Sequence, residues 1–264
     1  MNFLYEFENK KISNYDFKEA LFNLGVKEGD IVFLHSDITV FGKLILSNRK
    51  EFFNSIISSV KEVVGENGTI IMPSFSYSFC KGEIFDVQKT KGTVGALNEF
   101  FRKSDDTVRT VQPIFSCSIW GKGKNEFREV SLDSFGKDSI FDKLFKNRGK
   151  LLFLGADFHA CTYLHYIEQS FKIPYRYLKV FKGKIKNEEK DYLAECKFYV
   201  RYLDKNVILE TERLKNHLLG KNIMKQTKVG AGSILLIDSK DLYDEVFELL
   251  KKDIFYLLKE PVKI

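Results

Sequence analysis

Short apolar runs, each followed by a segment with helical spacing, organise most of this chain of 264 residues. The runs at 30–36, 68–73 and 150–154 are almost wholly apolar between their ends and rich in branched side chains. Continuous runs of this length, bounded by glycine and polar residues, predict strands buried on both faces. Buried strands alternating with amphipathic segments are typical of an α/β protein.

Apolar residues spaced three and four apart predict the helices. Phe52, Ile56 and Val60 recur at every fourth position of 48–64, for example. Similar spacing predicts helices over 13–24, 91–103, 139–146, 162–170, 207–219 and 242–258. Thr93 is the expected N-cap of the helix in 91–103, and residues 1–12 are expected to be a loosely held lead-in.

The last third of the chain has a different pattern. Residues 175–192 are rich in lysine, and 196–202 alternate like a strand with one exposed face. We interpret 172–238 as strands and a helix appended to the main sheet, as a possible subsidiary lobe that closes one side of a cleft. The sequence has no internal repeat and no flexible linker, so residues 1–264 are expected to form one domain.

Composition narrows the function classes. The formal net charge is +6, from 42 Lys and Arg against 36 Asp and Glu, which mildly favours anionic ligands. The lysines form no basic run, so no nucleic acid is expected as a partner. The apolar runs are too short to cross a bilayer, and residues 1–11 lack the pattern of a signal peptide. These features predict a cytoplasmic protein that acts on small molecules.

The four cysteines, Cys80, Cys117, Cys161 and Cys196, show neither C-x-x-C nor metal-ligand spacing. We therefore expect no metal site and no disulfide framework, which fits a reducing compartment.

The stretch 149–170 (GKLLFLGADFHACTYLHYIEQS) is the richest in candidate chemistry. A strand, a turn at Gly155 and a helix opened by Thr162 would place His165 and Glu168, three residues apart, on one helical face. A carboxylate beside an imidazole fixes its tautomer and raises its proton affinity, as a general base requires. The same spacing also suits a surface ion pair or, without further ligands nearby, a two-residue metal site. Cys161 is either an acyl-accepting nucleophile or a small buried thiol.

Further candidates follow the other two buried strands, where ligands collect in α/β proteins. His35 and Ser36 end the first strand. The loop 74–79 (SFSYSF) after the second alternates hydroxyls and rings, which suits either the lining of a pocket or a packed surface loop. The glycine-rich segment 92–96 can offer backbone N–H groups to a phosphate, or simply begin a helix.

These features, taken in order, resemble the aminoglycoside 3-N-acetyltransferase family, also called antibiotic N-acetyltransferases. The resemblance covers most of residues 20–170 and is carried by short segments: Leu24-Gly25, Gly29-Asp30, Leu34-His35-Ser36, Gly68-Thr69, Met72-Pro73-Ser74-Phe75, Val94-Gly95-Ala96-Leu97, Arg109, Pro113, Phe135-Gly136, Ser139, Leu154-Gly155, Thr162, Leu164-His165 and Glu168.

The resemblance implies a mixed α/β sheet flanked by helices, and direct transfer of an acyl group from acyl-CoA to an amine. It implies His165 as the base, with Glu168 as its carboxylate, and no metal. It also implies a coenzyme site formed by residues near the strand ends and the glycine-rich segment, namely His35, Ser36, Ser74, Thr93, Val94 and Gly95.

One segment departs from the drug-modifying members of the family. Those members carry a His-Pro-Thr-His-Ser-like segment where this chain has Gln112-Pro113-Ile114-Phe115-Ser116. Aminoglycosides are polycations, whereas this chain is net basic. Both differences favour an anionic acceptor such as a nucleotide-linked amino sugar, for example a dTDP-3-amino-3,6-dideoxyhexose of a surface-polysaccharide pathway. Its acceptor site is predicted at Phe75, Tyr77, Phe79 and Phe115, for which ordinary packing is the alternative.

Three alternatives remain open at the level of sequence: an aminoglycoside 3-N-acetyltransferase that confers resistance, a catalytically inactive binding protein, and a carbohydrate-binding module. Retention of both His165 and Glu168 disfavours the second, and a single tryptophan disfavours the third. A homodimer is possible.

Overall fold

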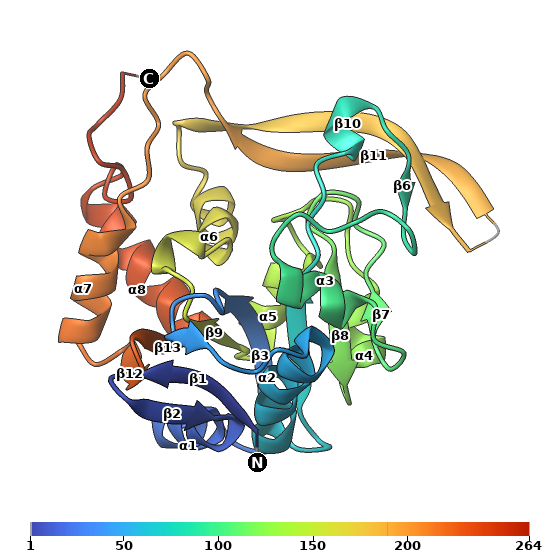
Figure 1. Cartoon of the computed structure of the whole chain (residues 1–264). Helices are drawn as coiled ribbons and strands as arrows, with labels where there is room; N and C mark the ends of the chain where they lie inside the picture. Colours follow the sequence, from blue (N-terminus) through green and yellow to red (C-terminus); the bar gives the residue numbers. More distant parts are fainter. Residues whose placement is uncertain (1, 189, 264) are drawn as a thin grey trace.

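A computed structural model describes residues 2–188 and 190–263 of the chain (Figure 1). The elements in chain order are β1 (Phe3–Phe7), β2 (Lys10–Ser13), α1 (Asn14–Leu24), β3 (Ile31–Ser36), β4 (Lys43–Leu44), α2 (Arg49–Val64), β5 (Thr69–Pro73), the 3-10 turn η1 (Phe79–Lys81), β6 (Phe85–Asp86), α3 (Ala96–Arg102), β7 (Val108–Arg109), β8 (Cys117–Gly121), α4 (Lys124–Arg128), α5 (Ile140–Lys146), β9 (Lys150–Leu154), the 3-10 turn η2 (Phe158–Ala160), α6 (Tyr163–Phe171), β10 (Arg176–Asn187), β11 (Lys190–Arg201), α7 (Thr211–Gly220), β12 (Lys225–Val229), β13 (Gly232–Asp238) and α8 (Ser239–Lys252).

The main sheet is mixed, as the family resemblance implied. Its seven strands lie in the order β12-β13-β9-β3-β5-β8-β7. β3 runs parallel to both β9 and β5, and the strands outside this central trio pair antiparallel. Because parallel strands end at the same edge, Ser36, Pro73 and Leu154 bring three loops together there.

Alternate side chains of the central strands enter two different cores. Val32 and Leu34 belong to a core shared with α1 and α2, whereas Phe33 belongs to one shared with α5, α6 and α8. Side chains of a strand alternate between the two faces of a sheet, so burial of both faces requires the continuous apolar runs seen in the sequence.

Several helix ends follow local sequence. The Asn48 side chain accepts hydrogen bonds from the N–H groups of Lys50 and Glu51, both at 3.1 Å, and so begins α2. Ser139 begins α5 in the same way, accepting from the Asp142 N–H at 3.2 Å. Such caps satisfy backbone donors that lack a partner within the helix.

The long hairpin β10/β11 lies at one end of the molecule, beyond α6, in Figure 1. Its strands pair in continuous antiparallel register from Arg176 opposite Arg201 to Asn187 opposite Lys190. With β6 it forms a separate three-stranded sheet, whereas β12 and β13 extend the main sheet. The strand predicted over 196–202 is the end of β11 nearer the body, while the pairing of 176–187 was not predicted.

Two local predictions are wrong. The lead-in at residues 1–12 contains β1 and most of β2, and Tyr5 of β1 is only 1% exposed because it packs among Phe17, Phe41 and Phe52. Short strands of this kind are stabilised by distant contacts, which local spacing does not reveal. The helix expected over 91–103 begins only at Ala96, as described below. Among the described residues, no helix is both long and apolar enough to cross a membrane.

Candidate active site

The helix α6 carries the predicted catalytic pair. Thr162 is its N-cap residue, and the three-residue spacing places His165 and Glu168 on one face. Nδ1 of His165 lies 2.6 Å from Oε2 of Glu168. The Glu168 side chain is fully buried, whereas the His165 side chain is 25% exposed. This arrangement excludes a simple surface ion pair, because the carboxylate has no contact with solvent.

A second cation compensates the buried carboxylate. Nε of Arg176, at the start of β10, lies 2.9 Å from the same Glu168 oxygen, and its side chain is 7% exposed. Burial alone would raise the pKa of Glu168, but the charge of Arg176 and the hydrogen bond with His165 outweigh it and lower that pKa. Glu168 is therefore ionised in the folded protein at neutral pH.

An ionised Glu168 fixes the tautomer of His165. A carboxylate without a proton can only accept, so Nδ1 of the imidazole carries the hydrogen of the 2.6 Å bond. In the neutral ring, Nε2 then keeps its lone pair. His165 therefore has the tautomer of a general base whose free nitrogen is Nε2.

A cavity of about 470 Å³ opens beside His165. The hairpin face above α6 contributes Phe181 and Phe198, whose rings stack at 5.3 Å with an interplanar angle of 9°. Lys179 and Arg201 also line it. Among the described residues, no lining side chain carries a carboxylate. The space next to His165 is therefore lined by apolar side chains and by positive charges.

The four predicted acceptor residues lie outside the lining of this cavity. Phe75, Phe79 and Phe115 are at most 5% exposed, and only Tyr77, at 44%, presents a ring to solvent. Phe79 packs against Gly183, where an added Cβ would lie 2.7 Å from its ring. The structure thus gives the three phenylalanines packing roles, and the accessible aromatic rings beside His165 are on the hairpin instead.

The predicted coenzyme residues are spread over two strand ends and a loop. His35 is buried and stacks on Phe153 at 5.1 Å, and burial lowers its pKa to about 3, so its ring is neutral. The Ser36 hydroxyl donates to Oδ1 of Asn98 at 3.0 Å, and the Asn98 amide donates to the Pro73 carbonyl at 2.9 Å. Asn98, which the sequence did not single out, therefore connects the ends of β3 and β5.

The glycine-rich segment differs from the predicted helix start. The Thr93 hydroxyl donates to the Phe75 carbonyl at 3.1 Å instead of capping a helix, and α3 begins after Gly95, whose φ is +117°. Val94, between them, is half-buried. The Gly92 N–H donates to Oε2 of Glu99 at 3.1 Å, so this donor is not open to a phosphate. The N-cap prediction for Thr93 is wrong because a distant carbonyl competes for its hydroxyl.

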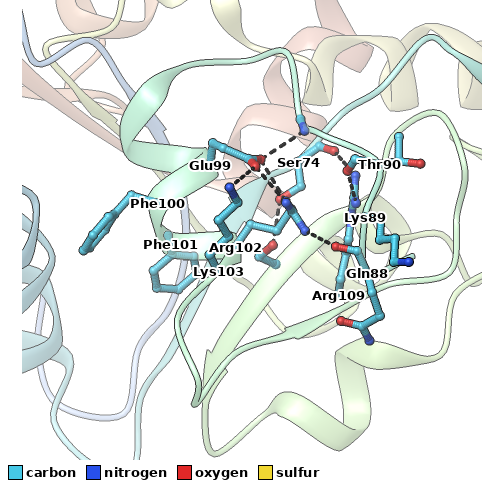
Figure 2. Close-up of polar contacts among 12 residues, drawn as sticks. Ser74, Gln88, Lys89, Thr90, Glu99, Phe100, Phe101, Arg102, Lys103 and Arg109 are labelled. Atoms are coloured by element: carbon cyan, nitrogen blue, oxygen red, sulfur yellow. Dashed lines mark hydrogen bonds and ion pairs between the residues drawn. The ribbon is translucent and has the colours of Figure 1, made fainter. Parts of the chain in front are cut away.

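Figure 2 shows the polar network that holds this loop. Arg102 forms two hydrogen bonds with Glu99, at 2.7 and 2.8 Å. The half-buried Arg109 donates from its guanidinium to the carbonyls of Thr90 and Ser74 at 2.5 and 2.8 Å. Ser74 itself is buried, with its hydroxyl 2.7 Å from that of Ser118. Ser74 therefore stabilises the glycine-rich loop through its backbone carbonyl, which accepts from Arg109.

Cys161 is a buried thiol. It is 3% exposed, and burial raises its pKa to about 12, so it is not a thiolate at neutral pH. Nucleophilic catalysis by cysteine requires a lowered pKa, and the structure therefore disfavours a role for Cys161 as acyl acceptor. No cluster of metal-ligating side chains occurs in the part of the chain that the structure describes.

Comparison with known proteins places the chain in a family. The family model described as aminoglycoside 3-N-acetyltransferase matches residues 33–251. The SPbeta prophage-derived aminoglycoside N(3')-acetyltransferase-like protein YokD of Bacillus subtilis is 30% identical over 183 residues, 60% of this chain and 64% of that relative. Aminoglycoside N(3)-acetyltransferase IV of Salmonella sp is 24% identical over 94% of this chain and 92% of its own length.

Solved structures agree with this fold. The binary complex of AAC-IIIb with CoASH is 21% identical and superposes with a TM-score of 0.78, covering 91% of this chain and 96% of that one. The fold and the family match make the chain an enzyme of the CoA-dependent N-acyltransferase class. It belongs to the aminoglycoside 3-N-acetyltransferase family.

Proposed function

We propose that this enzyme transfers an acyl group from acyl-CoA to the amine of an amino sugar, with His165 as general base. The observation that carries the proposal is the 2.6 Å contact between Nδ1 of His165 and the fully buried, ionised Glu168, beside an accessible cavity. The thioester of the co-substrate supplies the acyl group.

The residues of the chain account for the proton transfers. An ammonium group cannot attack a thioester, so the acceptor must lose a proton. That proton goes to solvent, and the neutral amine attacks the thioester carbonyl. Nε2 of His165 takes the second N–H proton as the C–N bond forms, while Nδ1–H remains bonded to Glu168, whose negative charge stabilises the imidazolium formed. The C–S bond then breaks, and the imidazolium gives its proton to the departing CoA thiolate, which leaves as the free thiol. The ring of Phe135 packs against the imidazole with centroids 5.5 Å apart and shields one side of it from water. Thr162, one helical turn before His165, and Ser36 are the proposed hydroxyl donors to the carbonyl oxygen as it gains charge. To do so, each must release its present bond, from Thr162 to the Ala160 carbonyl at 3.3 Å and from Ser36 to Asn98 at 3.0 Å.

The proposed site for the acyl-CoA co-substrate lies at the residues that follow Ser36. The loop after β3 lines a second cavity of about 380 Å³, with apolar Ile38, Leu44 and Leu46 and, at its edge, Arg49. A largely apolar cavity that also contains a cation suits a long thiol arm that ends in phosphates. We therefore propose that His35, Ser36 and this loop hold the coenzyme, with Gly95 and its neighbours on the adjacent loop.

The names of the relatives favour an aminoglycoside as acceptor. YokD is described as aminoglycoside N(3')-acetyltransferase-like, and the Salmonella relative as an aminoglycoside N(3)-acetyltransferase. On this basis the first candidate reaction is N-acetylation of an aminoglycoside by acetyl-CoA.

The cavity favours a second candidate, a nucleotide-linked amino sugar. Lys179 and Arg201 line the space beside His165 without forming an ion pair in the described part of the chain. A polycation would be repelled there, whereas a diphosphate would be attracted. The stacked rings of Phe181 and Phe198 offer the aromatic surface that a nucleobase needs, in place of the buried rings predicted from sequence.

A thiol-release assay distinguishes the acceptors. The enzyme is supplied with acetyl-CoA or a longer acyl-CoA and either a gentamicin-type drug or a dTDP-amino sugar. Turnover with the drug alone rejects the second candidate, and turnover with the sugar nucleotide alone rejects the first. His165→Ala should lower kcat by about 10²–10⁴ with either acceptor, and a loss below about tenfold would contradict the assigned base.

A matched pair of lysine variants tests the positive lining. Lys179→Met should raise KM for the sugar nucleotide, and added salt should do the same. Lys182→Met is the control, because Lys182 lies on the same strand but outside the cavity lining and pairs with Glu195 at 2.7 Å. Equal KM values for the two variants would contradict a diphosphate site at Lys179.

We also propose that the chain acts as one domain in the cytoplasm, with its four cysteines reduced as in the structure. A homodimer is proposed through the exposed apolar side chains of the hairpin, such as Leu178, Val180 and Leu193. Light scattering on the purified protein measures its mass directly, and a monomer at micromolar concentration would reject the dimer.

A further inference from the structure

The carboxylate of Glu168 has two partners on one oxygen. Oε2 lies 2.6 Å from Nδ1 of His165 and 2.9 Å from Nε of Arg176. Its side chain has no exposed surface, and that of Arg176 is 7% exposed. A carboxylate removed from water takes up a proton unless a nearby positive charge compensates it. Arg176 lies beyond the short motifs on which the sequence resemblance was based, and the sequence did not single it out, although the family model covers it.

The protonation state of Glu168 decides which nitrogen of His165 is free. An ionised Glu168 accepts the Nδ1 hydrogen and leaves the lone pair on Nε2. A protonated Glu168 would instead donate its O–H to Nδ1, and the hydrogen of the neutral ring would then sit on Nε2. With the hydrogen on Nε2, His165 cannot accept a proton from the acceptor amine.

We propose that Arg176 is a positioning residue that keeps Glu168 ionised and thereby holds His165 in the tautomer of a base. This inference rests on the proposed function in taking His165 as the base, but the tautomer can be measured without turnover.

The other groups around the pair do not replace Arg176. Lys179 on β10 and Arg201 on β11 line the same cavity and add positive charge, and His159 on η2 lines it as well, but none of the three forms an ion pair with Glu168 in the described structure. Tyr175 and Tyr199 lie close enough to Glu168 for its charge to act on their phenols, and the Tyr199 hydroxyl donates to the Ile173 carbonyl at 2.5 Å. Burial first, and then the Glu168 charge, raise the pKa of both, so they are neutral at the pH of interest.

Ring-nitrogen NMR tests the tautomer directly. The protein is labelled with ¹⁵N-histidine, and the signals of His165 among the four histidines are assigned from their loss in His165→Gln. The wild type and Arg176→Lys should show the Nδ1–H form at neutral pH. Arg176→Met should show the Nε2–H form or an imidazolium. Should Arg176→Met not fold, Arg176→Gln, which also lacks the charge, replaces it. An unchanged Nδ1–H neutral ring in the uncharged variant would overturn the proposal.

The pH dependence of kcat/KM gives a second readout. A higher pKa of Glu168 moves the acidic limb to higher pH, so removal of the Arg176 charge should raise the pH of that limb by about one unit or more. Arg176→Lys should leave the limb in place. If Arg176 served only to stabilise the folded structure, its replacement would lower kcat/KM without moving the acidic limb of the pH profile. This result would overturn the proposal.

Glu168→Gln provides the matched background. If Arg176 acts through Glu168, then Arg176→Met should shift the limb in the wild type but not in Glu168→Gln. A shift of equal size in both backgrounds would contradict the coupling. If no acceptor is turned over at all, the proposed function fails, while the NMR measurement still decides the role of Arg176.

Discussion

Replacing Gly155 by alanine tests whether the turn from β9 toward the active-site helix needs a residue without a side chain. Gly155 has φ +75°, and an added Cβ would lie 2.2 Å from the Asp37 carbonyl oxygen and 2.8 Å from Cγ2 of Val40. The nearest atom is backbone, so no rotamer change can relieve the overlap. The loop that follows Ser36 must move, and that loop is the proposed coenzyme site.

The expected cost has two parts. A left-handed backbone costs a residue with a Cβ about 1–2 kcal/mol, and overpacking adds about 1–3 kcal/mol. Together they predict a loss of about 2–5 kcal/mol in the free energy of unfolding. At about 2 °C per kcal/mol for a chain of this size, Tm should fall by about 4–10 °C.

Gly29→Ala is the control. Gly29 has a similar φ of +83°, but an added Cβ would meet no atom within 4 Å. Its Tm should therefore fall by only about 2–4 °C, from the backbone term alone. Calorimetry on the two variants therefore separates the cost of overpacking at Gly155 from the backbone cost that both positions share. A Tm loss for Gly155→Ala no larger than that for Gly29→Ala would refute the argument that the close approach at Gly155 is costly. An unchanged KM of Gly155→Ala for acyl-CoA would refute the proposed link between this turn and the coenzyme loop.

Three further outcomes are expected. Cys161→Ala should keep kcat within about twofold, because a thiol with pKa about 12 is no nucleophile; a hundredfold loss would contradict this. Lys150→Met should cost about 1–3 kcal/mol in urea unfolding, since it leaves the half-buried Asp30, 2.5 Å from Nζ, without its partner. Burial alone would raise the pKa of Glu99, but its hydrogen bonds with Arg102 and with a backbone N–H outweigh this and lower it to about 2. Its contribution to stability is therefore complete above pH 4.5 and lost as pH falls toward 2. In Glu99→Gln, Tm should depend less on pH within this window. An unchanged slope of Tm against pH would argue against a stabilising Glu99–Arg102 pair.

Features set by neighbouring residues could be predicted from sequence. The helices predicted over 48–64 and 139–146 and the almost wholly apolar central strands are of this kind, because each depends on contacts within a few positions or on burial of a whole run. The pairing of His165 with Glu168 is also local, since one helical turn brings them together.

The rest depends on segments that are far apart in the chain. Thr93 has the side chain of an N-cap, yet the carbonyl of Phe75, 18 residues away, takes its hydroxyl. The rings of Phe75, Phe79 and Phe115 look like an acceptor site in sequence, but the hairpin and the main core cover them. Spacing along a chain does not tell which residue a distant strand will place over a ring.

The sequence by itself determined an α/β protein whose helix after the third buried strand carries a histidine and a carboxylate on one face. Only the tertiary structure decided that Glu168 is fully buried, that Arg176 from the following strand compensates it, and that the cavity beside His165 is lined by Lys179 and Arg201. The physical reason is that helical periodicity acts over three or four residues, whereas burial and charge compensation depend on every element packed around a site.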